Sequence, residues 1–356
     1  MTLRELNRAL LARQMLLERS PLHPVEAVRR LVGLQAQQLR PPFLGLWTRL
    51  AGFESPILQE ALEARRIVRA TMMRATLHMV TAEDYLAFRQ TMQPVLTAAM
   101  LSVVKSRGAS LDVEAVVAAA QRAFRQTPQT FEQLRDRLLA EFAGLDERAM
   151  GYIARMRIPL VMVPGESEST FALAAEWLGQ PVPGEERTAD LILRYLAAFG
   201  PATAADAQAW IGLPKLKPVF DNLRPQLVTL SDEKGRELFD LPDAPRPGGD
   251  TPAPVRFLPG FDSAILGHAD RTRIIADAHR PLVATKNLQV LPVFLVDGFA
   301  AGVWSMNQAK TRATLTVSPF AALSSRVRKE VEREAEAVLA FVASGAGTAE
   351  VVFAQA

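Results

Sequence analysis

The 356-residue sequence contains no cysteine. This absence excludes disulfides, thiolate nucleophiles, iron–sulfur clusters and cysteine-bound zinc. Only four histidines are present, at positions 23, 78, 268 and 279, and none forms an HExxH pair, so we expect neither a metal nor an organic cofactor. No segment approaches the ~18 consecutive apolar residues of a membrane helix, and the first residues lack the apolar centre of a signal peptide. We therefore expect a cytoplasmic protein without membrane contact.

Common catalytic motifs are also missing. The sequence has no GxxxxGK[ST] loop, no GxGxxG following a strand and no GxSxG turn. These absences exclude P-loop nucleotide hydrolases, dinucleotide-binding domains and α/β-hydrolases. An enzyme with this sequence must therefore catalyse a reaction that needs few specialised catalytic groups.

Positive charge is concentrated in the N-terminal third. Residues 1–110 contain fifteen Lys and Arg against eight Asp and Glu, whereas the remainder contains 26 against 30. Fourteen of the fifteen cations are arginine, whose planar fork suits phosphate oxygens. The pattern favours an anionic partner, although a solvated surface in a chain with only seven lysines would look the same.

The same order of elements is predicted three times. Apolar spacing predicts helices near 3–17, 24–37, 43–51 and 56–64, where Pro41 and Pro42 end the second helix. Strands 67–72 and 75–80 form a hairpin around Met73-Arg74, and Thr81 begins a helix to about 104. In the second round, helices are predicted at 112–125, 130–142 and 146–155, and strands at 160–163 and 170–173. In the third round, helices are predicted at 188–199, 203–211 and 215–224, and strands at 227–230 and 237–241.

Short helices followed by a two-stranded wing are typical of winged-helix modules. We therefore predict a mainly α fold with small β content, built from tandem winged-helix modules at residues 1–110, 111–180 and 186–242. A proline- and glycine-rich linker precedes a small α+β domain at 254–356. In that domain, strands 291–296 and 302–306 flank the turn pair Asp297-Gly298, and a strand at 312–317, a helix at 320–343 and a strand at 349–353 follow.

One polar segment stands out, Leu34-Gln35-Ala36-Gln37. Two residues two positions apart on a regular helix point roughly 200° apart and cannot meet one target. Gln35 and Gln37 converge only if the helix ends between them. Taken alone, such a pair is typical of a solvated helix end.

Three blocks resemble the AlkZ/YcaQ-like winged-helix DNA glycosylases, in the order expected of that family. The Gln35–Gln37 segment is similar to the family's Gln-φ-Gln motif. Residues 74–85, with Arg74 and His78, resemble its Arg-(small)-Thr-Leu-His-(apolar)-Val stretch. Residues 258–273 resemble its Leu-Pro-x-Phe-Asp … Leu-Gly-x-x-Asp-Arg block, with Gly260 where an acidic residue is common.

The resemblance implies a C-shaped channel around double-stranded DNA that contains alkylated bases. It implies a monofunctional glycosylase of base excision repair that releases N7-alkylguanine, and in some members unhooks interstrand crosslinks or gives self-resistance to alkylating natural products. Gln37 places the chain with the AlkZ-like Gln-φ-Gln branch. We expect a nucleoid-associated monomer with Gln35 and Gln37 as catalytic residues and these DNA-binding residues: Arg40, Arg65, Arg66, Arg69, Arg74, His78 and Arg271.

Two amides can serve this chemistry. Glutamine is neutral and is not a strong base, but an N7-alkylated guanine is already cationic and leaves without an acid. The sugar then needs electron-rich oxygens and one positioned water. We assign the water to Gln37, and the orientation of the sugar or of that water to Gln35. The site should favour charged lesions, and an open channel should tolerate bulky ones, which cannot easily be flipped into a tight pocket.

Structural alternatives stand beside these assignments. His78 is also a candidate for a hydrogen-bonded core histidine. Asp262, Asp270 and Arg271 are candidates for an ion-paired block that pins the C-terminal unit to the repeats. At the level of the whole protein, a non-catalytic winged-helix regulator or lesion sensor, or a protein-binding scaffold, would share this element order.

Overall fold

The computed structural model describes residues 1–107, 110–165, 169–285, 289–309, 312–343 and 347–354. The N-terminal part follows the predicted order of helices, hairpin and helices. Its elements are α1 (Leu3–Arg13), α2 (Pro24–Arg30), β1 (Leu34–Gln35), α3 (Pro41–Trp47), α4 (Ser55–Glu63), β2 (Ile67–Thr71), β3 (Leu77–Thr81), α5 (Ala82–Phe88) and α6 (Gln93–Ser106).

Several helices of this part end earlier than the sequence predicts, and α2 and the helix that begins after Thr81 differ most. α2 stops at Arg30, not near Gln37, because Gly33 adopts φ +92° and its N–H bonds back to the Val28 carbonyl. A side chain at Gly33 would begin only 2.6 Å from Val80 Cγ1. Glycine, rather than the prolines, therefore ends the helix and leads into β1. The helix predicted to reach 104 is likewise two helices, α5 and α6, and Pro94 lies in the first turn of the second.

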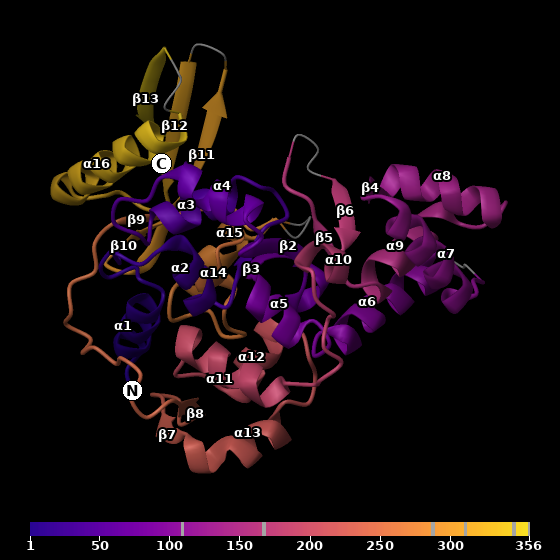
Figure 1. Cartoon of the computed structure of the whole chain (residues 1–356). Helices are drawn as coiled ribbons and strands as arrows, with labels where there is room; N and C mark the ends of the chain where they lie inside the picture. Colours follow the sequence, from indigo (N-terminus) through magenta and orange to yellow (C-terminus); the bar gives the residue numbers. More distant parts are fainter. Residues whose placement is uncertain (108–109, 166–168, 286–288, 310–311, 344–346, 355–356) are drawn as a thin grey trace.

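The middle of the chain confirms the predicted helices and hairpins to within a few residues. Side-chain caps at Thr130 and Thr203 begin two of these helices. The elements are α7 (Val113–Gln126), β4 (Gln129–Thr130), α8 (Phe131–Glu141), α9 (Glu147–Arg157), β5 (Leu160–Met162), β6 (Thr170–Leu173), α10 (Ala174–Leu178), α11 (Thr188–Phe199), α12 (Ala204–Ile211), α13 (Lys217–Leu223), β7 (Val228–Ser231) and β8 (Glu237–Asp240). In Figure 1, α7–α9 project to one side and α11–α13 lie below the N-terminal helices.

The first two hairpins join into one six-stranded sheet of order β1-β3-β2-β5-β6-β4. β2 pairs with β5 through Arg69 opposite Met162 and Ala70 opposite Val161. The fold is mixed α/β, with 46% helix and 19% strand, so the prediction of a mainly α fold with small β content understated the sheets. The physical reason is edge pairing, because an exposed hairpin edge carries unpaired backbone groups that a second hairpin satisfies.

The C-terminal part contains the predicted α+β arrangement. A five-stranded sheet of order β13-β12-β11-β10-β9 packs against α16, whose Val331, Ala335 and Val338 are buried. Asp297 and Gly298 both have positive φ, as a two-residue hairpin turn requires. The elements are β9 (Arg256–Leu258), α14 (Ser263–Leu266), α15 (Arg280–Val283), β10 (Val293–Val296), β11 (Phe299–Gln308), β12 (Arg312–Pro319), α16 (Ser325–Val342) and β13 (Thr348–Phe353).

Buried ion pairs join the N-terminal helices to distant parts of the chain. The Arg49 guanidinium donates to both oxygens of Asp262 at 2.7 and 2.8 Å, and Arg13 donates to both oxygens of Asp240 at 2.7 and 2.8 Å. All four side chains are almost fully buried. This set, here called the Arg–Asp seam, agrees with the structural interpretation of Asp262.

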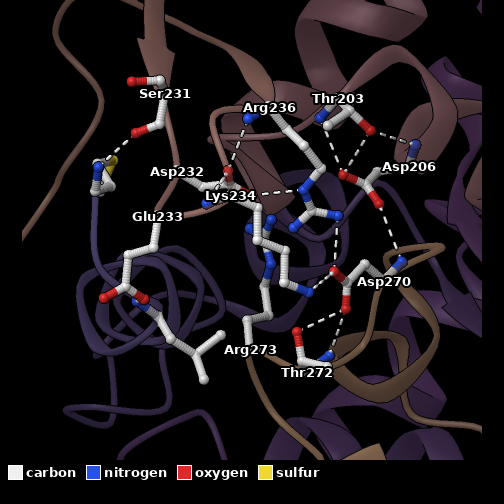
Figure 2. A network of polar contacts seen from close by, with 12 residues as sticks. Thr203, Asp206, Ser231, Asp232, Glu233, Lys234, Arg236, Asp270, Thr272 and Arg273 are labelled. Atoms are coloured by element: carbon white, nitrogen blue, oxygen red, sulfur yellow. Dashed lines mark hydrogen bonds and ion pairs between the residues drawn. The ribbon is translucent and has the colours of Figure 1, made fainter.

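A second polar network pins the β7–β8 hairpin to the segment that follows α14 (Figure 2). Arg236 bridges Asp232 and Asp270, and Asp270 also accepts from Thr272. Asp206 accepts from the backbone N–H of Ala269 and of Asp270. Asp270 therefore has the pinning role that the structural alternative predicts. Within the described part of the chain, no helix is long and apolar enough to cross a membrane.

Candidate active site

The two glutamines of the Gln35–Gln37 segment line one cavity of about 570 Å³. Gln35 lies in β1, directly opposite His78 of β3, and Ala36 continues the pairing through its N–H to the Leu77 carbonyl. Gln35 is the last residue of β1, and Gln37 lies two residues further on, in a bend that follows the buried Ala36. Both glutamines thus lie at the end of a short strand rather than at the end of a helix.

Gln35 is held rigidly. Arg74 Nη2 donates to Gln35 Oε1 at 2.9 Å, and Arg74 Nη1 donates to the Trp210 carbonyl. Because a guanidinium only donates, the atom that faces it must be the amide oxygen. The second lone pair of that oxygen and the amide N–H groups stay available. Gln37 is exposed, and its side chain has no hydrogen bond to any residue that the structure describes. One amide is fixed and the other is adaptable.

A second arginine holds the backbone of the same segment. Arg69 Nε donates to the Ala36 carbonyl at 2.7 Å, and its Nη2 donates to the Gln37 carbonyl at 2.8 Å. Arg69 is only 6% exposed. The structure thus directs both Arg69 and Arg74, predicted as DNA contacts, inward toward the glutamines.

His78, opposite Gln35 in the β1–β3 pair, is fully buried, which does not fit the prediction that it contacts DNA directly. Its Nδ1 lies 3.0 Å from the Thr76 carbonyl. A carbonyl only accepts, so the hydrogen belongs on Nδ1, and Nε2 is a bare acceptor without a partner among the described residues. Burial, together with the charge of Arg74, lowers the pKa of His78 to about 3. The ring is neutral near pH 7, as the core-histidine alternative predicts.

A cation, Arg74, lies next to the cavity through its hydrogen bond to Gln35. Burial, assisted by the charge of Arg271, lowers the pKa of Arg74 to about 10, so Arg74 is still cationic near pH 7. Of the described residues that line the cavity, none is acidic and none is histidine. The chemistry available there is hydrogen bonding by amides next to a fixed cation.

The remaining predicted contacts do not line the glutamine cavity. Arg65 donates to the Trp177 carbonyl and lies over its ring, 4.2 Å from the centroid. Arg66 forms an exposed ion pair with Glu60 at 3.2 Å. Arg40 is exposed, and its side chain has no partner in the described ranges. Arg271 lines a separate cavity.

Several lining residues were not predicted. Thr76 follows the Arg74 turn, Phe261 has φ +61°, and residues 289–292 form the far wall. Phe261 lies within the Leu-Pro-x-Phe-Asp block, which marks it in the sequence. Residues 289–292 carry no motif, and only the folding of that loop back toward β1 brings them to the site.

The comparisons with known proteins agree with this geometry. The family model described as "DNA glycosylase AlkZ-like" matches residues 28–341. The chain belongs to this family. It is a DNA glycosylase, a hydrolase of N-glycosyl bonds, as the three sequence blocks predicted. The match to an enzyme family argues against the two alternative functions, a non-catalytic regulator or lesion sensor and a protein-binding scaffold.

A curated relative and a solved structure, both from Streptomyces sahachiroi, match nearly the whole chain. The protein named "Interstrand DNA cross-link repair glycosylase" is 27% identical over 346 residues, covering 91% of this chain and 92% of the relative. The solved structure of the DNA glycosylase AlkZ has a TM-score of 0.81 at 23% identity, covering 99% of this chain and 100% of AlkZ. This AlkZ-like glycosylase therefore has the AlkZ fold.

Proposed function

We propose that this glycosylase hydrolyses the N-glycosidic bond of cationic alkylated purines in duplex DNA, N7-alkylguanine above all, as a monofunctional base-excision enzyme acting as a monomer. The observation that carries the proposal is the pair of amides, Gln35 and Gln37, in a cavity whose described lining has no acid. A neutral leaving group would need a proton donor there. A base that is already positive does not.

The two glutamines have different tasks in this proposal. Gln35, fixed by Arg74, presents its amide to the sugar, where a rigid dipole stabilises charge without rearrangement. Gln37, exposed and adaptable, holds the attacking water. His78 keeps Nδ1–H on Thr76 and stays neutral, so it adds no competing acid.

The proposal extends to bulky adducts and interstrand crosslinks as substrates. The relative from Streptomyces sahachiroi is named for crosslink repair. In this chain the glutamines line a cavity of about 570 Å³, larger than a single methylated base requires. We further propose that tandem winged-helix modules form a DNA channel, which the three successive sets of helices and hairpin support. Arg40 and Arg271, and less directly Arg65 and Arg66, are the proposed phosphate contacts.

The test is base release from duplex DNA that carries N7-methylguanine. We expect release by the wild type, and a loss of at least about 100-fold for Gln35→Ala and for Gln37→Ala. Gln126→Ala, on the exposed face of α7, is the matched control and should keep full activity. Duplexes with hypoxanthine, a neutral base, should be poor substrates. Equal release of hypoxanthine and N7-methylguanine would contradict the proposal, as would an active double glutamine variant.

A further inference from the structure

A second cavity, of about 550 Å³, lies near the glutamine cavity and has a different character. Arg271 and Arg280 supply its positive charge, and Asp277 is the only acid among its described lining residues. Asp277 is exposed and pairs with Arg280 at 3.3 Å. Ile265, Ile275 and Val283 form apolar walls. We call it the Arg271 cavity.

Arg271 is a cation without a counterion. Its side chain has no hydrogen bond or ion pair with the described residues, and its Nε is buried and unsatisfied. Burial and the nearby charge of Arg280 lower its pKa. The neighbouring carboxylate, Asp270, is turned away toward Arg236, Lys234 and Thr272 (Figure 2). An unpaired, half-buried guanidinium is unfavourable unless an anion completes its shell.

Arg273, two residues further on, shows how a structural arginine differs. It is fully buried, and its Nη1 donates to the Pro201 carbonyl at 2.8 Å. Burial lowers the pKa of Arg273, and the nearby charges of Asp206 and Asp270 oppose that lowering. Arg273 is satisfied by the fold, whereas Arg271 faces a cavity that the fold leaves open.

The two cavities share a wall. Residues of the segment 280–284 line the Arg271 cavity, and residues 289–292 line the glutamine cavity. The two segments are hydrogen-bonded, with Leu291 N–H donating to the Val283 carbonyl at 2.9 Å and Ala284 paired with Val290. Paired backbones lie ~5 Å apart. Arg271 is also close enough to Arg74, the anchor of Gln35, to lower its pKa.

We infer that the Arg271 cavity binds a phosphodiester group of the lesion-bearing DNA strand, adjacent to the nucleotide held at Gln35 and Gln37. The inference rests on the proposed function. Two arginines select an anion, and the guanidinium fork matches phosphate oxygens. Successive nucleotides of a strand lie ~3.4 Å apart along the helix axis. A phosphate one or two nucleotides away from the lesion can therefore lie on the other side of the shared wall. The apolar walls suit the deoxyribose. A phosphate fixed there positions the sugar at the glutamines.

The experiment compares Arg271→Gln and Arg271→Lys with wild type, using the full chain and an unmodified duplex over a range of salt concentrations. We expect Arg271→Gln to weaken binding about tenfold and to lower the salt slope by about one unit, with Arg271→Lys intermediate because it keeps charge but loses the fork. Arg326→Gln, whose side chain is 89% exposed on α16, is the control and should change neither quantity.

The Tm distinguishes the proposed role of Arg271 from a structural role, because the two roles predict different changes in Tm on substitution. Removing an unpaired cation should leave the Tm of free Arg271→Gln unchanged or higher, whereas Arg273→Gln should lower it. A lower Tm for Arg271→Gln with an unchanged salt slope would overturn the inference. Inorganic phosphate should raise the Tm of wild type more than that of Arg271→Gln. If it does while the DNA salt slope is unaffected, the cavity takes free phosphate and the DNA assignment is wrong.

Failure of this inference and failure of the proposed function are separable. Binding to the unmodified duplex does not require base release, so an inactive wild type that shows the Arg271 effect would reject only the proposed reaction. An active enzyme whose Arg271→Gln variant binds and cleaves normally would reject only the phosphate site.

Discussion

Arginine is buried in two different ways in this glycosylase. In the Arg–Asp seam, Arg49 and Arg13 each face a carboxylate with two short hydrogen bonds. Near the glutamines, Arg74 donates to an amide and a carbonyl, and Arg271 has no partner in the described residues. The seam neutralises its charge to hold distant segments together. The glutamine region leaves its charge uncompensated, which stabilises the fold less but suits a polyanionic substrate.

The largest expected effect comes from breaking the seam. Asp262→Asn removes the charge opposite Arg49 while keeping an oxygen that can cap α14. We expect it to lower the free energy of unfolding by about 3–5 kcal/mol, because a buried guanidinium loses its counterion. Urea denaturation measures the loss. Asp221→Asn, in an exposed pair with Lys217, is the control and should cost less than about 1 kcal/mol. Equal losses would mean that burial does not distinguish these pairs.

Acid should act through the buried histidines. The folded-state pKa of His78 is about 3, below the ordinary value of 6.5, and that of His268 is likewise lowered by burial. Below about pH 6.5 the unfolded chain binds protons that the folded chain does not. Stability is therefore complete above pH 6.5 and falls toward pH 3, by up to about 1.4 kcal/mol per pH unit for each histidine.

His78→Gln tests this dependence. The variant should lose less stability than wild type between pH 6.5 and 4.5, as measured by the free energy of unfolding at each pH. Parallel curves for the two proteins would show that His78 protonates in the folded chain. The base-release rate of wild type should be free of a His78 titration in this range.

Arg74→Met should separate catalysis from stability. Without its guanidinium, Gln35 loses the bond that orients its amide, so we expect single-turnover base release to fall about 10- to 100-fold. The free energy of unfolding should fall less than in Asp262→Asn, because Arg74 has no carboxylate partner that the substitution would leave unpaired. Arg326→Met, at the exposed pair with Glu330 on α16, is the matched control. A variant that unfolds easily yet releases bases at the wild-type rate would assign Arg74 to the fold alone.

The smallest effect should come from the exposed Arg40. If Arg40 contacts a phosphate, Arg40→Gln lowers the salt slope of duplex binding by about one unit and weakens all sequences alike. Arg66→Gln should change the slope less, because Arg66 already pairs with Glu60. Titrations at several salt concentrations measure both. An unchanged slope for Arg40→Gln would remove Arg40 from the DNA surface.

Local chemistry made much of the fold predictable. Thr81 and Thr203 cap helices as their spacing indicates, and Asp297-Gly298 forms the predicted turn. These features depend on a few adjacent residues. The end of α2 was missed because Gly33, not the proline pair, sets it, and β1 is too short to show a period of its own.

The site was predictable in its residues but not in its geometry. Gln35 and Gln37 were found through a family resemblance, yet the position of Gln35 depends on pairing between β1 and β3, and Gln37 lies in the bend that follows. The internal roles of Arg69 and Arg74 depend on burial, which composition does not reveal. An arginine bound to a carbonyl and an arginine awaiting a phosphate look the same in a sequence.

The sequence by itself determined the absence of cysteine chemistry, the order of most helices and hairpins, and the three blocks that mark a DNA glycosylase. Only the tertiary structure decided that two hairpins share one sheet, that two glutamines face one cavity, and which arginines are neutralised. The reason is that propensity, capping and turn chemistry act between neighbours in sequence. Strand pairing, burial and charge compensation join residues far apart in the sequence, such as Arg49 and Asp262, which are 213 positions apart.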